Sequence, residues 1–273
     1  MKILFFGDVV GKSGRGAVAK ILPELKKQYE PDLVIANAEN VAHGKGVTIH
    51  TVSALFDAGV DFCTSGNHVF DKPDVKSVFE QFPDRIIRPA NLPENLPGKG
   101  MAVLNVQGHL VMIANLNGRV FMEKQFDFGQ IDNPFTKLDA ILAAADPDVK
   151  IRLLDFHAEA TSEKRGMGLY ADGKLSCVLG THTHVQTNDA QVLPNGTGYL
   201  SDLGMVGAAG SIIGVKAEGS IKRLMKEGEG GTRPPIEIDE SDRYETGFAL
   251  ITIDERTGKC QNIRAELRIE NLG

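Results

Sequence analysis

The stretch "KILFFGDVVGKSG", residues 2–14, joins an apolar, strand-like run to a glycine-bearing turn. A phosphate-binding P-loop has the form G-x-x-x-x-G-K-[ST], but here only three residues separate Gly7 from Gly11, which precedes the Lys-Ser pair. Asp8 also places a fixed negative charge where such a loop offers backbone N–H groups to a polyphosphate. The sequence therefore argues against a P-loop and indicates that Asp8 has a chemical role of its own.

The chain has 273 residues, of which 42% are hydrophobic, so it is long enough to bury a sizeable core. Its formal net charge of -6 comes from mixed signs, and no basic stripe indicates a nucleic-acid duplex as the main partner. The N-terminus shows no signal peptide, and no apolar run is long enough to span a membrane. We expect one cytoplasmic domain over residues 1–273, without a membrane partner.

Short apolar runs alternate with amphipathic stretches over most of the chain. The runs are mostly continuous rather than alternating, which is typical of strands covered on both faces. We expect Thr48 to cap the second helix, and Pro23 to kink or interrupt the first. The predicted strands are 2–7, 32–39, 60–66, 85–91, 109–116, 150–157 and 175–182, and the predicted helices are 15–29, 48–58, 73–81 and 134–145.

The C-terminal part has a different pattern. Residues 204–214 and 227–235 are rich in glycine and are expected to form loops. Strand-like runs at 247–254 and 261–270, joined by "ERTGK", predict a closing hairpin. Residues 204–243 are therefore a candidate for a small cap or lid inserted into the domain.

Polar residues with metal-ligand chemistry stand at the ends of the predicted strands, where ligands of open α/β sheets gather. Taken singly, each has an ordinary explanation, such as a helix cap for Asp8, a turn residue for Asn67 or a core histidine for His157. Together they form an oxygen and imidazole set without sulfur, which suits Mn, Fe, Zn or Mg. Buried together without a cation they would carry a large desolvation cost, so the sequence predicts a bound metal. The candidate ligands are Asp8, Glu39, Asn40, Asn67, His157, His182 and His184.

Seven candidates exceed the three or four protein ligands that one catalytic ion usually takes. Two ions sharing a carboxylate would use them all, and Glu39 is the natural bridge. Two metals roughly 3.5 to 4 Å apart serve in-line displacement at phosphorus. His68 lies beside Asn67 but outside this set, so we expect it to face the substrate as a proton donor.

These residues carry a resemblance to the calcineurin-like metallophosphoesterase superfamily, because "GNH" at 66–68 and "GTHTH" at 180–184 are similar to its G-N-H-[DE] and G-H-x-H blocks. The chain departs from that pattern twice. Val10 replaces the histidine of the usual D-x-H block, and "NAEN" replaces G-D-x-x-D. Both departures match the bacterial YmdB-like 2′,3′-cyclic-nucleotide phosphodiesterase branch, which also shares "RPAN", "PGKG" and "DFHAEATSEK". The resemblance covers residues 1 to about 206.

The resemblance implies an α/β fold, a four-layer αββα sandwich, with a di-iron or di-manganese centre and with substrates among cyclic nucleotides, 2′,3′-cyclic before 3′,5′-cyclic, and related phosphodiesters. A metal-bridging hydroxide would attack phosphorus, and His68 would protonate the leaving ribose oxygen. The resemblance also suggests a homo-oligomer, a dimer or tetramer. By position, one metal would be held by Asp8, Glu39, Asn40 and His184, and the other by Glu39, Asn67, His157 and His182.

Two other functions stay open, an RNA-binding regulatory protein that keeps the metal site and a phosphomonoesterase. The acidic charge and sparse aromatic residues count against the first, although RNA ends remain candidate partners. His43 and Arg119 are candidate substrate contacts, with a backbone-bonded loop histidine and a solvated arginine as the ordinary explanations. Glu159 and Glu163 are expected to orient His157, or, for Glu163, to cap a helix. The ligand types accept either Fe or Mn.

Overall fold

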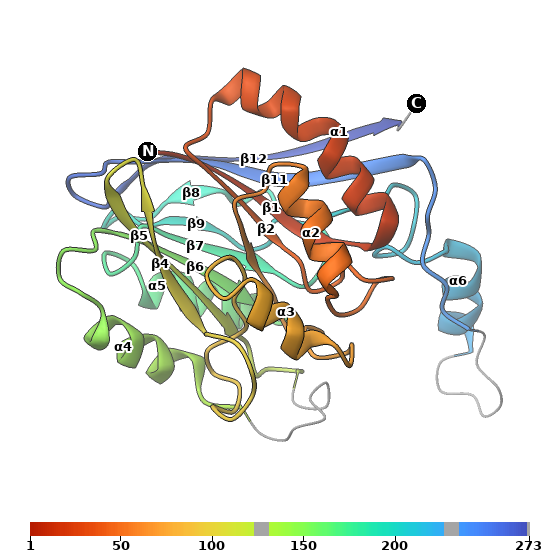
Figure 1. Cartoon of the computed structure of the whole chain (residues 1–273), viewed down its shortest axis with the longest axis horizontal. Coiled ribbons are helices and arrows are strands. Elements are labelled where there is room, and N and C mark those ends of the chain that lie inside the picture. Colours follow the sequence, from red (N-terminus) through yellow and green to blue (C-terminus); the bar gives the residue numbers. More distant parts are fainter. Residues whose placement is uncertain (123–130, 227–234, 272–273) are drawn as a thin grey trace.

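The computed structural model describes residues 1–122, 131–226 and 235–271, and within these ranges the chain forms two six-stranded sheets (Figure 1). In the first sheet β10, β1, β2 and β3 run parallel to one another, and β11 pairs antiparallel with β10, β1 and β12. Its strands, in spatial order, are β12 (Cys260–Asn271), β11 (Arg243–Ile253), β10 (Met205–Ala208), β1 (Lys2–Val9), β2 (Leu33–Asn37) and β3 (Phe62–Thr64).

The second sheet has a parallel centre with an antiparallel strand at each edge. Parallel neighbours leave the carboxyl ends of the central strands along one side of the sheet. Its strands, in spatial order, are β4 (Met101–Val106), β5 (His109–Asn117), β6 (Ile151–His157), β7 (Cys177–Thr181), β9 (Gly198–Leu200) and β8 (Gln191–Val192).

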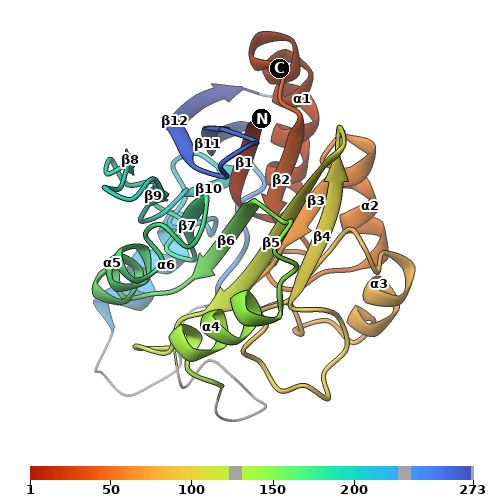
Figure 2. The same ribbon diagram turned by 90° about the vertical axis from the view of Figure 1, so that its left-hand side faces the viewer.

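Alternating side chains of the central strands supply separate cores, which explains the continuous apolar runs. On β1, Leu4 and Phe6 belong to a cluster with the helices outside the first sheet, whereas Ile3 and Phe5 pack between the sheets. A third cluster joins the outer face of the second sheet to two more helices. Figure 2 shows the two helix sets on opposite sides of the molecule. These helices are α1 (Gly11–Tyr29), α2 (Ile49–Asp57) and α3 (Val75–Gln81) on one side, and α4 (Pro134–Ala144) and α5 (Thr161–Tyr170) on the other.

The predicted four-layer αββα sandwich is thus confirmed, with burial of each large apolar side chain contributing about 1.5–3 kcal/mol. Thr48 caps α2 as predicted, since its hydroxyl accepts the Thr51 N–H and the Thr51 hydroxyl accepts the Thr48 N–H. The predicted interruption at Pro23 is wrong, because α1 continues to Tyr29. Pro23 lies on the exposed face, where the carbonyl it leaves unbonded, that of the exposed Ala19, can be hydrated.

The predicted strand 85–91 is also wrong: its only strand-type pairing in the described structure is the single bridge between Ile86 and Cys63. Its N–H groups bond in two directions. Ile87 donates to Cys63 beside the first sheet, and Ala90 donates to Asn115 on β5, so the segment crosses from one sheet to the other. Pro89 contributes no N–H at all, which further prevents a regular ladder.

The C-terminal hairpin is confirmed as β11 and β12, which pair antiparallel. The predicted loop at 204–214 is partly wrong, because Met205–Ala208 form the buried strand β10 between β1 and β11. The predicted elements also lack β4, β8, β9, α5 and a further helix, α6 (Ala217–Met225), which stands apart from both sheets (Figure 1). A cap in the remainder of 204–243 stays a prediction, and most of the expected loop 227–235 lies outside the described residues. Of the described helices, none combines the length and apolar character needed to cross a bilayer.

Candidate metal centre

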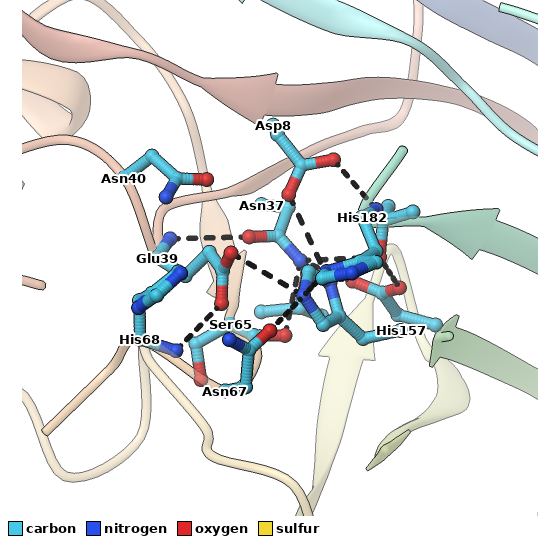
Figure 3. Close-up of polar contacts among 12 residues, drawn as sticks. Asp8, Asn37, Glu39, Asn40, Ser65, Asn67, His68, His157 and His182 are labelled. Atoms are coloured by element: carbon cyan, nitrogen blue, oxygen red, sulfur yellow. Dashed lines mark hydrogen bonds and ion pairs between the residues drawn. The ribbon is translucent and has the colours of Figure 1, made fainter. Parts of the chain in front are cut away.

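The side chains predicted as ligands gather where the central strands of the two sheets end, and Figure 3 labels all of them except His184. Asp8 lies on β1, opposite Asn37 of β2 in the strand register, and His157 ends β6 opposite Thr181 of β7. The other candidates follow β2, β3 and β7 directly in the chain. Because parallel strands bring their carboxyl ends to one side, residues up to 176 positions apart meet here, from Asp8 to His184.

Among the described residues, two groups of three histidine or carboxylate side chains have ligand atoms within 4.8 Å of one another. The first, called here the inner group, consists of Glu39, His157 and His182, and the second, called the outer group, consists of Asp8, Glu39 and His184. Glu39 is common to both and is almost fully buried. The arrangement can therefore hold two cations that share one carboxylate.

The two asparagines lie at the histidine nitrogens of these groups. Asn67 Oδ1 is 2.9 Å from His157 Nε2, and Asn40 Oδ1 is 3.2 Å from His184 Nε2. One amide oxygen thus accompanies each group, and the structure brings all seven predicted ligand residues into one connected site. That they bind metal remains a prediction.

One carboxylate oxygen of the site, Asp8 Oδ1, is buried without a hydrogen-bond partner among the described residues. Asp8 Oδ2 accepts the His182 N–H at 3.0 Å, whereas the buried Asp8 Oδ1 has no hydrogen-bond partner among the described residues. Its nearest ion-pair contact is His157 Nδ1 at 3.8 Å. An unbonded carboxylate oxygen out of reach of water is costly. A cation at the outer group would compensate it.

Burial and neighbouring charges shift the pKa values of the carboxylates and of His157 in the site. Burial raises the pKa of Asp8 to about 6, while His184 and His157 act in the opposite direction. Burial also opposes a charge on Glu39, but His157 outweighs it and holds the pKa of Glu39 below its usual range. Burial likewise opposes a charged His157, yet Glu39 outweighs it and raises the pKa of His157 to about 9. In the protein without metal, the His157 proton thus takes the place of a cation.

A buried hydrogen-bond chain that sequence analysis missed orients His157. The Thr181 hydroxyl donates its single proton to Asp155 at 2.7 Å, so it must accept from His157 Nδ1, which lies 2.8 Å away. That bond directs His157 Nε2 to the centre, as is usual for ligating histidines with a bonded second nitrogen. Asn37 also donates to Asp155, at 2.9 Å, and thereby joins β2 of the first sheet to β6 of the second. Only the position of Asp155 two residues before His157 could have indicated its role.

The loop that carries His182 and His184 is held in a strained form. Both histidines have positive φ, 102° and 65°, which is uncommon for residues other than glycine. The buried Lys164 donates to the Thr181 carbonyl at 2.8 Å and to Asp202, and Asp202 accepts the Thr183 N–H at 3.1 Å. This ion pair therefore fixes the backbone on both sides of His182.

His68 lies against the inner group without belonging to it. Its backbone N–H donates to Glu39 Oε2 at 2.9 Å, and its Nδ1 lies 2.9 Å from Asp71 Oδ2. The side chain is about one-quarter exposed. With Nδ1 bonded to Asp71, Nε2 is the nitrogen available to a bound substrate.

The remaining predictions for this region have mixed outcomes. His43 is exposed in the loop after β2 and has a positive φ of 55°, and Arg119 is half-buried after β5. Glu159 contacts His182 Nε2 at 3.0 Å rather than His157. Glu163 neither orients His157 nor caps its own helix, because its carboxylate accepts the Arg119 N–H at 2.9 Å. Spacing along the sequence indicated the neighbourhood of these carboxylates but not their partners.

The loop after β1 does not cradle phosphate. Gly11 opens α1, and its N–H donates to the Asn40 carbonyl at 3.0 Å, so it is not free for a ligand. The next glycine N–H, that of Gly14, donates to Val10 within the first turn. These two glycine N–H groups are thus engaged within the protein, and the chemical role of Asp8 stays a prediction.

Comparison with known proteins identifies the family. The model of the family described as YmdB-like protein matches residues 4–265. The chain belongs to the YmdB-like family. A curated relative, the 2′,3′-cyclic-nucleotide 2′-phosphodiesterase of Bacillus subtilis, is 41% identical over 264 residues, which cover 96% of this chain and 95% of the relative. The YmdB-like resemblance drawn from the residue motifs is thereby confirmed.

Solved structures extend the comparison from sequence to fold. The crystal structure of a hypothetical protein from Thermus thermophilus has a TM-score of 0.87 at 37% identity, covering 99% of this chain and 100% of that chain. A novel phosphatase from Mycoplasma pneumoniae has a TM-score of 0.89 at 34% identity, covering 99% and 94%. The 5′-nucleotidase of Candida albicans, at 12% identity and a TM-score of 0.58, covers 97% of this YmdB-like chain and 51% of its own, and shares the fold alone.

Proposed function

We propose that this protein is a dinuclear metal-dependent phosphodiesterase that hydrolyses 2′,3′-cyclic nucleotides at the 2′ ester bond. The observation that carries the proposal is the carboxylate of Glu39 shared by two ligand groups, with His68 bonded to that same carboxylate. Two neighbouring cations are the arrangement used for displacement at phosphorus. The name of the Bacillus subtilis relative supports the choice of substrate and of ester bond.

In this proposal Glu39 would help to hold both ions, with a second carboxylate, one histidine and one asparagine in the outer group and with two histidines and one asparagine in the inner group. When bound, the ions neutralise phosphate oxygens and activate water. Iron and manganese both suit oxygen and imidazole ligands. Asp8, Asn40 and His184 would hold one ion with Glu39, and Asn67, His157 and His182 would hold the other.

His68 would act as the general acid. In the imidazolium form Nδ1–H donates to Asp71, and Nε2–H is available to protonate the leaving 2′ oxygen as the bond between phosphorus and that oxygen breaks. Water supplies the new oxygen on phosphorus, so the product is a nucleoside 3′-phosphate. Asp71 and the backbone bond to Glu39 together fix the position of the imidazole.

A substrate panel tests the reaction. Metal-loaded protein is incubated with 2′,3′-cAMP, 3′,5′-cAMP, bis-p-nitrophenyl phosphate and p-nitrophenyl phosphate, and products are separated by chromatography. The proposal expects conversion of 2′,3′-cAMP to 3′-AMP at the highest kcat/KM. Release of nitrophenol from the monoester alone would favour a phosphomonoesterase, and binding of RNA ends with no turnover would favour the regulatory alternative.

A variant tests the role of His68. We expect His68→Ala to retain metal and to lose about 100- to 10,000-fold in kcat on 2′,3′-cAMP, the usual range for general acid catalysis. The loss should be smaller on bis-p-nitrophenyl phosphate, because its leaving group needs less protonation. His50→Ala, an exposed histidine on α2, is the matched control. Equal rates for parent and His68→Ala on both esters, at equal metal content, would contradict the assignment.

Two broader expectations complete the proposal. A homo-oligomer, dimer or tetramer, is to be tested by light scattering coupled to gel filtration. A cytoplasmic location is to be tested by cell fractionation.

A further inference from the structure

A pocket of about 480 Å³ lies at the carboxyl end of β5, the strand whose last residue, Asn117, is the register partner of His157. Its described lining combines a cation, two aromatic rings and a carboxylate. We call it the β5 pocket, and define it by Arg119, Val120, Phe121, Phe135 and Glu163. Apolar and aromatic walls with a few polar groups are typical of small-molecule sites.

The β5 pocket is connected to the metal centre through the backbone. Asn117, at the end of β5, is the register partner of His157, and the Gly118 N–H donates to the His157 carbonyl at 2.8 Å. A Cβ on Gly118 would lie 2.5 Å from Ala158 Cβ, so the chain after β5 packs directly on the chain after His157. Glu159, the next residue, contacts His182 of the inner group. The pocket therefore begins within a few residues of the reacting centre.

The turn that forms the pocket rim is fixed in place. Glu163, which is only 8% exposed, accepts the N–H groups of Arg119 at 2.9 Å and Val120 at 3.1 Å. Carboxylates that accept two backbone N–H groups hold a turn firmly, because the bonds are charge-assisted. The rim thus presents its side chains from a defined position.

One side chain of this rim has a strained backbone, and another has no polar partner among the described residues. Phe121 is 80% exposed and has a positive φ of 65°, a conformation that is rare and strained for an aromatic residue. The Arg119 guanidinium makes no hydrogen bond or ion pair within the part of the chain that the structure describes, although the protein carries a net charge of -6. Strain of this kind persists where it serves binding more often than elsewhere.

We propose that the β5 pocket binds the base of the nucleotide substrate, with Phe121 stacking on the ring and Arg119 bonding to its polar edge. The inference rests on the proposed function, since the cyclic phosphate would occupy the metal centre next to it. An aromatic face stacks on any base, and arginine adds a cation over or beside the ring. The pocket accordingly selects nucleotides over base-free cyclic phosphodiesters, and acts through KM rather than through the chemical step.

The test compares a substrate with and without a base. Steady-state constants are measured for 2′,3′-cAMP and for methyl ribofuranoside 2,3-cyclic phosphate, which keeps the cyclic ester and lacks the base. Phe121→Ala should lose about 5- to 150-fold in kcat/KM on 2′,3′-cAMP, mainly through KM, the range that base stacking gives. Its constants on the base-free ester should equal those of the parent, and Phe121→Trp should recover most of the loss.

The matched control is Leu110→Ala, an exposed apolar residue at the opposite end of β5. This variant should leave kcat and KM unchanged on both substrates. If Phe121→Ala lost equally on both substrates, or on neither, the base-binding role would be overturned while the phosphodiesterase activity stood. If the parent hydrolysed neither substrate, the proposed function itself would fail, and the two failures are thus distinguishable.

Discussion

The inner and outer groups of the candidate metal centre share Glu39 but are supported in different ways. His157 of the inner group is fully buried, and its second nitrogen is bonded to Thr181, whose proton goes to Asp155. His184 of the outer group is half-buried, and its second nitrogen bonds the backbone carbonyl of Ile213 at 2.9 Å. A buried hydrogen-bond network between the two sheets thus orients His157, whereas a single loop orients His184.

The loop at residues 211–215, which bonds His184 of the outer group, has few contacts by comparison. Ile213 is 53% exposed and has a positive φ of 49°. Among the described residues, its segment is held by single bridges from Val215 to Ile212 and to Ile238 and by a few hydrogen bonds of Ser211 and Gly214. Exposed backbone bonds open locally at lower free energy than buried ones. The difference teaches that two positions of one centre can have unequal affinity although their ligand types are alike, because the surrounding contacts orient the ligands.

The largest effect is expected from replacing Glu39, the carboxylate that both groups share. Glu39→Gln should lower metal content at both positions and reduce kcat/KM on 2′,3′-cAMP by at least about 1,000-fold, because several kcal/mol of charge stabilisation are lost. Elemental analysis and kinetics on the same sample measure this. Glu80→Gln, which alters an exposed carboxylate on α3, is the control and should retain both ions. Two ions in Glu39→Gln would refute a shared carboxylate.

The buried Lys164–Asp202 pair holds the loop that carries one histidine of each group. Lys164→Met should destabilise the fold by about 3–5 kcal/mol, because Asp202 is left buried and unpaired. Chemical denaturation measures the change. Replacing both partners, Lys164→Met with Asp202→Leu, should recover part of the stability. A single variant as stable as the parent would show that the loop of His182 and His184 does not depend on this pair.

A third variant tests whether the hydroxyl of Thr181 orients His157 in the inner group. Thr181→Val removes the hydroxyl that fixes His157 Nδ1 and should weaken metal binding by about 10- to 100-fold. Thr64→Val is the matched control, since Thr64 also donates to Asp155 but does not touch His157. Competition with a fluorescent chelator gives both affinities. Equal weakening in the two variants would assign the effect to Asp155 rather than to the orientation of His157.

The smallest expected effect is the difference between the two ions in the unaltered protein. Because the outer group rests on the Ile213 loop, its ion should leave first, with a Kd about tenfold higher than that of the inner ion. Dialysis against graded chelator, with elemental analysis at each step, should pass through a plateau of one ion per chain. Simultaneous loss of both ions would remove the distinction between the groups.

Sequence reasoning recovered the parts of the site that depend on residue chemistry at strand ends. Continuous apolar runs indicated strands buried on both faces, and the oxygen and imidazole residues after them were expected to meet. It did not anticipate the contacts that cross the molecule. Asn37 reaches Asp155 between the sheets, and Glu163 reaches the turn after β5, neither of which any local pattern indicates.

By itself, then, the sequence determined most of the central strands, their apolar faces and the kinds of atom offered at the carboxyl ends, because these follow from local composition and period. Only the tertiary structure decided that Met205–Ala208 join the first sheet, that Thr181 sets the orientation of His157, and that Lys164 and Asp202 hold the backbone beside His182. The reason is physical: such contacts join residues far apart in the chain, and their geometry is fixed by the packing of two sheets rather than by any neighbour in the sequence.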